Sequence, residues 1–561
     1  MSEGSVKPRG SLWLTSPAID LVIGCGAWSL PLMLLSYATP TALQGWTVAF
    51  YTVALIVNYP HYMATIYRAY HTREDVLRYR AVTIYITGLL LVVLAAAHWL
   101  YALVPWLFTI YFMWSPWHYM GQNFGLAMMF IGRSGVTLDR KYRNGLWAAF
   151  VASYLMFLFS FQTRRSLNPY VLSVELPPSL EALRTPLMFF FAAAGIFSLA
   201  QLIRQAGWRP MIAPSTLLLT QFLWSVLPTA FEFVTGAPAP QFFSASILAL
   251  MHCTQYLWIT SYYARREPRS VESGQWRASK YFAILVIGGA ALFIPGPWVA
   301  SYALGRDFSL SVLLFTAVIN IHHFILDGRV WKLREPRVRS LLTSTGQNPE
   351  PASTTPWGFG PGRPWRLAGT VAVALLLIIT GVDQVRYYLT KPEGNNAGLV
   401  MAATLNPYDS SVQTQLGRFY ASSGDKTRTE SSYRQSIRVN PHDTEAQNGV
   451  ARILIEEGRL GEAYAHYQQM FANMEPDAEA LMNFGAICKE FNRHDEALTS
   501  FQRVLEKRPD YAPAHLLLAE ILDADRKTPE AILHYQKYVD LQADPKLQTF
   551  ALSRLQELRK K

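Results

Sequence analysis

Cysteine is scarce in this chain of 561 residues, which contains three: Cys25, Cys253 and Cys488. They lie far apart, and neither C-x-x-C nor C-x-x-C-H occurs, so the sequence excludes covalent c-type haem, a cysteine zinc site and a disulfide framework. A phosphate-binding glycine loop, a serine nucleophile elbow and the H-E-x-x-H zinc motif are also absent. Enzymes that depend on those motifs are therefore not expected.

Acidic residues are scarce in the first part of the chain. Residues 1–390 contain 29 Lys and Arg against 15 Asp and Glu, whereas residues 391–561 contain 21 against 24. A basic excess often indicates a nucleic-acid partner, but here it lies in short connections between apolar segments, which is typical of membrane topology. We therefore expect no nucleic-acid partner, and two domains: a membrane domain over 1–390 and a soluble domain over 391–561.

Long apolar segments fill the first domain, and each is close to the roughly 20 residues that a helix needs to cross a bilayer. They are 17–37, 44–66, 81–100, 103–131, 146–163, 186–203, 212–233, 242–263, 281–300, 308–328 and 367–385. The sequence thus predicts an all-α protein with a bundle of about eleven transmembrane helices surrounded by membrane lipid. Residues 340–365, rich in Ser, Thr, Pro and Gly, are predicted to be a flexible cytoplasmic linker.

The basic residues also predict which way the bundle faces. Alternate connections carry 24 of the 29 Lys and Arg residues of the first domain. Because cytoplasmic connections are enriched in Lys and Arg, we expect a multi-pass protein of the inner (cytoplasmic) membrane with a cytoplasmic amino terminus. An odd number of spans then places residues 391–561 outside the cytoplasm.

After residue 390 the sequence acquires a period near 34 residues, which predicts four repeats, 410–443, 444–477, 478–511 and 512–545, and a capping helix over 546–559. Small residues recur where two helices must approach closely, and a large aromatic residue follows in each repeat. These positions are Gly417, Ala451, Gly485 and Ala519 on the first helices, Ala463, Ala497 and Ala531 on the second, and the aromatic residues Tyr433, Tyr467, Phe501 and Tyr535.

This pattern resembles the tetratricopeptide-repeat family over roughly residues 395–545. The resemblance implies an α-solenoid whose concave groove binds a protein or peptide partner. The sequence departs from the family pattern at Thr429, which replaces a small alanine, and in having no tryptophan on a first helix. An array that only stabilises or oligomerises its own chain is the alternative.

Ionisable residues inside apolar segments are costly and are functional candidates by default. Four segments carry a histidine with an amide or carboxylate three or four positions away, on the same helical face. The candidate metal ligands are His61, His118, His252 and His323, with His322 as the alternative to His323. The supporting residues are Asp20, Asn58, Gln122, Gln255, Asn320 and Asp327.

The depths of these histidines differ. His61 and His323 are expected near the cytoplasmic ends of their segments, and the other two lie deeper by roughly 10 Å. One shared site therefore requires tilted or broken helices, for which Pro60 and Pro116 are candidates. Glu232 is expected near the opposite membrane face and outside the site.

Three interpretations of the histidines stay open: a non-haem metal site, most simply iron; a b-type haem held by two facing histidines; and hydrogen bonding between helices with no cofactor. Isolated histidines on separate spans loosely resemble the integral-membrane carotene dioxygenases and related histidine-ligated oxidases. That resemblance implies an oxidase or oxygenase acting on a lipid-soluble substrate.

Two functions of other classes compete with an oxidase. A membrane scaffold or assembly factor would use the repeats alone. A GT-C-like glycosyltransferase would need carboxylates in its first external loop, and residues 38–43 contain none, so the sequence disfavours it. Whether the chain is an enzyme is left open by the sequence.

Overall fold

The structure is a computed structural model that describes residues 12–38, 53–136, 138–163, 178–237, 239, 244–266, 278–331, 335–343, 363–391, 396–541 and 545–560. These residues form helices and no β-strand, which confirms the predicted all-α fold class. The chain divides into two compact units, Met1–Val299 with Leu310–Tyr388, and Ala300–Ser309 with Leu389–Lys561. We call the first unit the bundle and the second the repeat unit.

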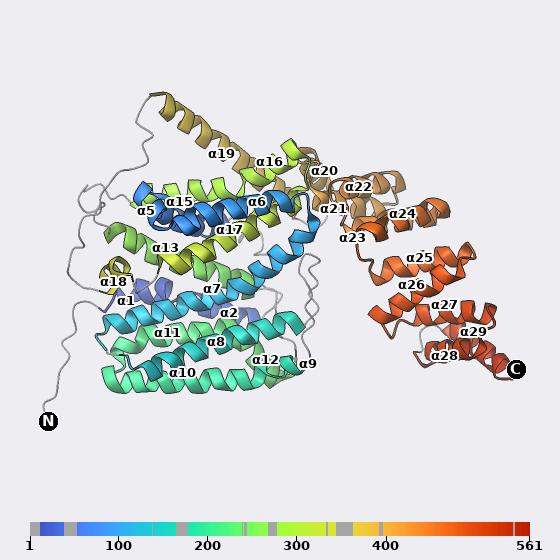
Figure 1. The fold of residues 1–561 in the computed structure, drawn as a ribbon, viewed down its shortest axis with the longest axis horizontal. Coiled ribbons are helices and arrows are strands. Elements are labelled where there is room, and N and C mark those ends of the chain that lie inside the picture. The colour runs from blue at the N-terminus through green and yellow to red at the C-terminus, as the bar shows by residue number, and fades with distance from the viewer. Residues whose placement is uncertain are drawn as a thin grey trace. The chain divides into compact units, whose positions relative to one another are not determined.

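The bundle consists of long helices that lie side by side, joined by shorter helices and turns (Figure 1). Its longer elements are α2 (Ser29–Ala38), α4 (Asn58–Tyr70), α6 (Thr87–Ala97), α7 (Val104–Arg133), α8 (Arg140–Thr163), α10 (Arg184–Ala206), α11 (Ile212–Gln221), α12 (Leu227–Thr235), α13 (Ser244–Arg266), α15 (Ala278–Phe293), α16 (Pro295–Leu304), α17 (Phe308–Val330) and α19 (Arg363–Leu389). Its shorter elements are α1 (Pro17–Ile19), η1 (Asp20–Gly24), α5 (Arg73–Arg78), η3 (Ala81–Ile86), η4 (Tyr101–Leu103), α9 (Pro178–Glu181), η5 (Arg209–Met211), η6 (Phe222–Val226) and α18 (Pro336–Thr343).

A glycine sets the spacing between α15 and α4. A Cβ atom at Gly289 would lie 2.6 Å from the carbonyl carbon and oxygen of Tyr59. Only glycine therefore allows this close approach of two helix backbones, a common device where helices pack tightly in membranes. The contact holds in place the helix that carries His61.

Polar side chains between α7, α8 and α11 form hydrogen bonds with one another. Asn123 donates from Nδ2 to Gln221 Oε1 at 2.9 Å, and Gln221 donates from Nε2 to Ser153 Oγ at 2.9 Å. All three side chains are buried. Asn123 Oδ1 has no hydrogen-bond partner among the described residues, so the network links the three helices without satisfying every polar atom.

The number of helices that can span a membrane is smaller than predicted. Among the residues that the structure describes, five helices are long and apolar enough, or up to six if one bent pair is counted as a span. They are Ser179–Ala206, Arg209–Thr235, Ala278–Leu304, Phe308–Val330 and Ala368–Leu389, and the bent pair is Pro17–Gly24 with Ser29–Leu35. The prediction of about eleven spans is therefore wrong by this criterion.

Length and composition explain the difference. The predicted segment 81–100 forms a helix over Ala81–Ala97, which is shorter than a span. In the predicted segment 44–66, α4 begins only at Asn58, and residues 44–52 lie outside the described residues. Helices α7 and α13 have 30 and 23 residues, but their His, Gln, Ser, Tyr and Trp side chains lower the mean hydropathy. Most of the predicted linker 340–365 also lies outside the described residues.

The repeat unit is a stack of antiparallel helix pairs (Figure 1). Its helices are α20 (Asn396–Leu405), α21 (Ser410–Ser422), α22 (Lys426–Val439), α23 (Thr444–Glu456), α24 (Leu460–Asn473), α25 (Ala478–Glu490), α26 (His494–Lys507), α27 (Ala512–Ala524), α28 (Thr528–Asp540) and α29 (Pro545–Leu558). The pairs from α21 to α28 fall within the four repeats expected from the 34-residue period.

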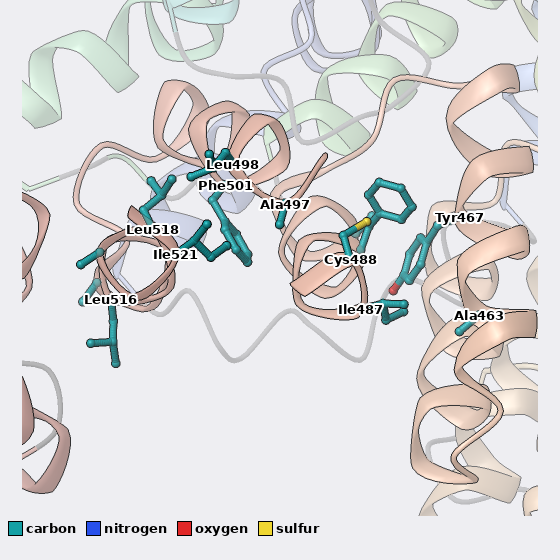
Figure 2. Packing of buried hydrophobic residues seen from close by; sticks show 14 of the residues in the cluster. Ala463, Tyr467, Ile487, Cys488, Ala497, Leu498, Phe501, Leu516, Leu518 and Ile521 are labelled. Atoms are coloured by element: carbon teal, nitrogen blue, oxygen red, sulfur yellow. The ribbon is translucent and has the colours of Figure 1, made fainter. Parts of the chain in front are cut away.

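The large aromatic residue of each repeat fills the space between successive pairs. Figure 2 shows Tyr467 beside Ile487 and Cys488, and Phe501 beside Ile521, all within one continuous core. A Cβ atom at Gly485 would lie 2.6 Å from the ring of Phe501, so the ring packs directly on the backbone of α25. The predicted close approach of small and aromatic residues therefore forms the core of the repeat unit.

Aspartate side chains begin several of the repeat helices. Asp443 and Asp477 accept hydrogen bonds from the backbone N–H groups of Ala446 and Ala480, at 3.1 and 2.7 Å. Such N-caps satisfy N–H groups that have no partner inside a helix. Asp477 also accepts from Asn448 Nδ2 at 3.0 Å, so one carboxylate caps its own helix and holds the preceding repeat.

Residues 300–309 belong to the repeat unit because they bind the turn before α21. The backbone N–H of Phe308 donates to the carbonyl of Tyr408 at 2.8 Å, and the N–H of Ser410 donates to Asp307 Oδ1 at 3.0 Å. Ser309 Oγ donates to Asp409 Oδ1 at 2.7 Å. These bonds anchor the first repeat to a segment that lies about a hundred residues earlier in the chain.

Candidate functional site

The structure brings the four candidate histidines together from α4, α7, α13 and α17. The ring centroids lie 4.8 Å apart for His61 and His323, 5.0 Å for His118 and His323, 4.8 Å for His118 and His252, and 5.4 Å for His61 and His252. His61, His252 and His323 are each no more than 2% exposed. We call these four residues the histidine cluster.

The ligand atoms of the cluster are within reach of one another. One nitrogen from each of His61, His252 and His323 lies within 4.8 Å of the other two, and the same holds for His118, His323 and a carboxylate oxygen of Asp327. Asp327 Oδ2 is 3.4 Å from His323 Nε2 and 3.6 Å from His118 Nε2. Asp327, expected only to support a ligand, therefore lies in the cluster itself.

Several nitrogens of the cluster lack a hydrogen bond. In the described part of the chain, the buried atoms His118 Nε2, His252 Nδ1, His252 Nε2 and His323 Nε2 have no hydrogen-bond partner. A buried polar group without a partner costs about 1–3 kcal/mol. The convergence of several such atoms in three neighbouring imidazoles is therefore expensive for the fold.

The other nitrogens of two rings are held by protein groups. His61 Nδ1 contacts the backbone carbonyl of Asn58 and lies 3.1 Å from Cys253 Sγ. His323 Nδ1 lies 3.0 Å from Thr65 Oγ1. In each ring this leaves Nε2 for the cluster, and a hydrogen bond at one ring nitrogen is how proteins orient a histidine ligand.

The amide side chains named by the sequence lie around the cluster. Gln122 Nε2 donates to Gln255 Oε1 at 3.0 Å and to the backbone carbonyl of His252 at 3.2 Å. Asn320 Oδ1 accepts from Tyr62 O–H at 2.6 Å, and the ring of Tyr62 packs 5.0 Å from that of His323. These amides therefore hold the helices and neighbouring rings rather than the imidazole nitrogens.

Two sequence-predicted residues lie elsewhere. Asp20 closes the turn before α1, because its carboxylate accepts from the backbone N–H of Leu14 at 2.6 Å and contacts Thr15. The alternative ligand His322 points away from the cluster, and its Nε2 lies 2.9 Å from Thr87 Oγ1. Adjacent residues on a helix are rotated by about 100°, so only one of the two neighbouring histidines joins the cluster.

Glu232 is also separate from the cluster, as expected. Its carboxylate lies 2.9 Å from the guanidinium of Arg184 and accepts from the backbone N–H of Ala239. Helix α4 begins at Asn58, one turn residue after the helical residues 53–56, and Pro60 lies in its first turn, one residue before His61. In contrast, α7 continues through Pro116 to Arg133.

A hydrogen-bonded group that the sequence did not identify surrounds Asp327. Tyr256 O–H donates to Asp327 Oδ1 at 2.7 Å, and Thr65 Oγ1 donates to the same oxygen at 3.0 Å. Trp331 Nε1 donates to the hydroxyl oxygen of Tyr256 at 2.6 Å. Tyr256 and Trp331 each follow a cluster residue by four positions, so the helical spacing was a usable signal for both.

Comparison with known proteins identifies only the second unit. The tetratricopeptide-repeat family model matches residues 414–473 and 490–547. The carboxy-terminal repeats are tetratricopeptide repeats. No curated protein sequence matches the chain.

Solved structures are similar to the tetratricopeptide repeats at low identity. They include MamA (15% identity, 27% of this chain and 88% of that chain, TM-score 0.25), YrrB, described as a tetratricopeptide-repeat protein with an unusual peptide-binding site (19%, 31% and 87%, 0.26), and pilF of Pseudomonas aeruginosa (16%, 32% and 86%, 0.29). The solved structures and the family model each match only part of the chain. The four helices of the histidine cluster lie outside the family match.

Proposed function

We propose that this chain is an integral membrane metalloprotein whose bundle holds a non-haem iron ion in the histidine cluster and whose tetratricopeptide repeats bind a protein partner. The observation that carries the proposal is the convergence of four buried imidazoles from four separate helices, with several ring nitrogens unpaired among the described residues. A bound metal ion would accept those nitrogens and offset the cost of burying them.

Exposed apolar side chains support the membrane part of the proposal. Leu375 and Ile378 on α19 are 61% and 63% exposed, and Ile196 on α10 is 64% exposed. Apolar faces of this kind are rare on soluble domains and are stable against lipid. The cluster-bearing helices α4, α7 and α13 pack inside the bundle, where polar side chains are shielded from lipid by neighbouring helices.

The donor set favours iron over haem. Imidazole nitrogens with one carboxylate and an open position are typical of non-haem iron oxygenases, and His118, His323 and Asp327 form such a set. A b-type haem would use two facing imidazoles, whereas here four imidazoles converge with ring centroids 4.8–5.4 Å apart. We therefore favour a non-haem ion over a b-type haem.

The chain's own residues have defined roles in this proposal. An iron ion held by these residues would supply the activation of dioxygen, which makes an oxidase or oxygenase the most fitting reaction class. Tyr256 and Thr65 orient the Asp327 carboxylate by donating to Oδ1, which leaves Oδ2 toward His118 and His323. The proton of the Tyr256 hydroxyl also lies in the hydrogen bond that this group donates to the Asp327 carboxylate.

Metal analysis tests this proposal. Chain purified after expression in iron-supplemented medium should contain about one iron per molecule and show no Soret band. His252→Ala and His118→Ala should each lose the iron, because each removes a ligand. His322→Ala is the matched control, since its ring lies on the other side of α17 against Thr87 and Tyr70, and it should keep the iron. A metal-free wild type, or equal metal content in all variants, would overturn the proposal.

The location of the two units is part of the same proposal. The bias of Lys and Arg toward alternate connections between the eleven apolar segments favours a cytoplasmic amino terminus and extracytoplasmic repeats, whereas the five or six helices long and apolar enough to span a membrane do not fix the number of crossings. Reporter domains fused after residue 561 and inserted within residues 340–365 should report opposite sides of the membrane. Reporters on the same side would show that the number of crossings after the insertion is even, and would place the repeats in the cytoplasm.

A membrane scaffold or assembly factor is the second candidate. The tetratricopeptide repeats favour it, because stacked repeats present an extended concave surface to a partner. Iron content and partner binding of the wild type and of His252→Ala separate the two functions. A scaffold would bind its partner and contain no iron in either protein. An oxidase would contain iron in the wild type and would lose both the iron and its activity in His252→Ala.

A further inference from the structure

A cavity of about 390 Å³ adjoins the histidine cluster between α7, α13 and α17. This volume lies within the range of about 300–1,000 Å³ that small-molecule sites have. His118, Gln122, Tyr256 and Asp327 line it at the cluster. The cavity therefore opens directly on two of the candidate iron ligands, the imidazole of His118 and the carboxylate of Asp327.

Three glycines provide the space of the cavity. Gly121 and Gly125 lie on α7 and Gly328 lies on α17, and all three line the cavity. A Cβ atom placed at any of them would meet no other atom within 4 Å. Glycine weakens a helix interior, and here no close packing requires it. The glycines keep volume free that ordinary side chains would fill.

Two of the polar side chains that line the cavity each have a buried atom without a hydrogen-bond partner. His118 Nε2 and Gln122 Oε1 are buried and have no hydrogen-bond partner among the described residues, and both side chains line the cavity. The side chains of His118 and Asp327 are each 9% exposed. An empty apolar void has no such groups, so the polar end of the cavity is a built binding site.

The rest of the lining selects the kind of ligand. The rings of Trp114, Trp117, Phe324 and Trp331 line the cavity, and Leu126, Met129 and Ile259 complete its apolar surface. Aromatic faces pack best on other flat π systems. Lys and Arg are absent from the described lining residues, so no basic side chain of the lining pairs with an anion.

We propose that this cavity binds a flat, uncharged, lipid-soluble ring compound and presents it to the His118–Asp327 side of the histidine cluster. That the bound compound is a substrate rests on the proposed function, and the compound is then the substrate class of the same site. In a bilayer, the flat compound competes for the cavity with the saturated acyl chains of the lipids. The aromatic lining favours the flat compound over these chains.

Photolabelling tests the proposal on the full-length chain in lipid nanodiscs. The probe is 1-azidopyrene, and labelled peptides are mapped by mass spectrometry. We expect labelling of the α7 segment between Trp114 and Met129, blocked by excess pyrene and not by hexadecane, which has the same number of carbon atoms. Blocking by hexadecane as strongly as by pyrene would show that the cavity holds any hydrocarbon, and would overturn the proposal.

A matched pair of glycine variants makes the test specific. Gly125→Leu fills the cavity and should reduce labelling of α7 at least tenfold. Gly381→Leu introduces the same side chain at an exposed glycine of α19, outside the cavity, where a Cβ also meets no atom, and should leave labelling unchanged. Undiminished labelling in Gly125→Leu would contradict the proposal.

Iron content of the same samples separates the two proposals. Gly125→Leu should retain the iron of the wild type, because leucine at this position fills the cavity and leaves every cluster ligand in place. A wild type that is labelled as expected but contains no iron would refute the proposed function and leave the binding site. A wild type that contains iron but shows no pyrene-sensitive label on α7 would refute the binding site alone.

Discussion

The two units of this protein differ in how their buried polar groups are arranged. In the tetratricopeptide repeats, Asp443 and Asp477 satisfy the first N–H groups of α23 and α25, although Asn448 Oδ1 and the Tyr467 hydroxyl are buried without a hydrogen-bond partner within the described structure. In the bundle, His252 is 1% exposed and neither of its ring nitrogens has a hydrogen bond within the described structure. The comparison teaches that the bundle is distinguished by the convergence of such atoms in neighbouring imidazoles, rather than by their burial alone.

The largest expected effect is on the core of the repeats. Phe501 is fully buried and packs against the backbone at Gly485, so Phe501→Ala should lower the free energy of unfolding by about 3–5 kcal/mol. The measurement is urea unfolding of residues 391–561, which we expect to fold alone because the repeats contain their own core. Leu533→Ala, at a position 57% exposed, is the control and should change it by less than about 0.5 kcal/mol. An unfolded wild-type fragment would contradict the predicted boundary near residue 390.

The second prediction is that a substitution of a buried residue in the bundle raises the free energy of unfolding, whereas Phe501→Ala in the repeats lowers it. His252→Leu removes two unpaired ring nitrogens at similar volume, so it should stabilise the metal-free chain by about 1–3 kcal/mol while abolishing iron binding. His98→Leu removes a histidine whose Nδ1 lies 2.8 Å from the carbonyl of Leu94 and whose Nε2 lies 3.1 Å from Ser311 Oγ. That substitution should destabilise the chain. Thermal unfolding of both variants in detergent, after chelation of metal, measures the difference. Destabilisation by both would mean that the histidine cluster is an ordinary structural network.

Sequence reasoning succeeded best where structure is local. The 34-residue period placed the helix pairs of the tetratricopeptide repeats, because each repeat packs mainly against its neighbours. Spacings of three and four residues selected the faces that carry His118 with Gln122 and His323 with Asp327. The structure brings these faces together, and the use of the histidines as iron ligands stays a prediction.

Features that depend on tertiary packing were harder to predict. Pro60 and Pro116 were the candidate helix breaks, but α7 continues through Pro116 while α4 begins at Asn58, so the prolines alone did not predict how the histidines come together. The count of eleven spans failed because an apolar segment in the sequence does not show whether it forms one continuous helix that is long and apolar enough to span a membrane. Asp20 was assigned to the site from its position in an apolar segment, although it satisfies the turn at Leu14.

The third prediction concerns a single cap. Asp477→Ala removes the N-cap of α25 and the hydrogen bond from Asn448, so it should lower the free energy of unfolding of residues 391–561 by about 1–2 kcal/mol. Asp510→Ala is the matched control, because Asp510 is exposed and the N-cap residue of α27 is Tyr511. Equal unfolding midpoints in urea for the two variants would show that the cap adds nothing to the repeats.

The smallest expected effect is the pH dependence of the tetratricopeptide repeats. Burial lowers the pKa of His466, whose Nε2 lies 3.0 Å from the carbonyl of Gln447, and burial together with His515 lowers the pKa of His534. Each imidazole therefore binds its proton more readily in the unfolded chain than in the folded one. The stability of the repeats that depends on these neutral histidines is complete above the pKa of histidine in the unfolded chain, about 6.5, and is lost as the pH falls below that value.

Thermal unfolding of residues 391–561 should accordingly show a lower midpoint at pH 5.5 than at pH 8, a window chosen to lie above the range where carboxylates titrate. His466→Gln keeps a side chain of similar size that does not titrate, so it should flatten this dependence, whereas the wild type should recover fully on return to pH 8. A midpoint that rises on acidification would mean that protonation of these histidines is favoured by the folded repeats. In that case the difference between the two units in their buried polar groups would be smaller, because imidazoles buried in the repeats would also lower the stability of the neutral form.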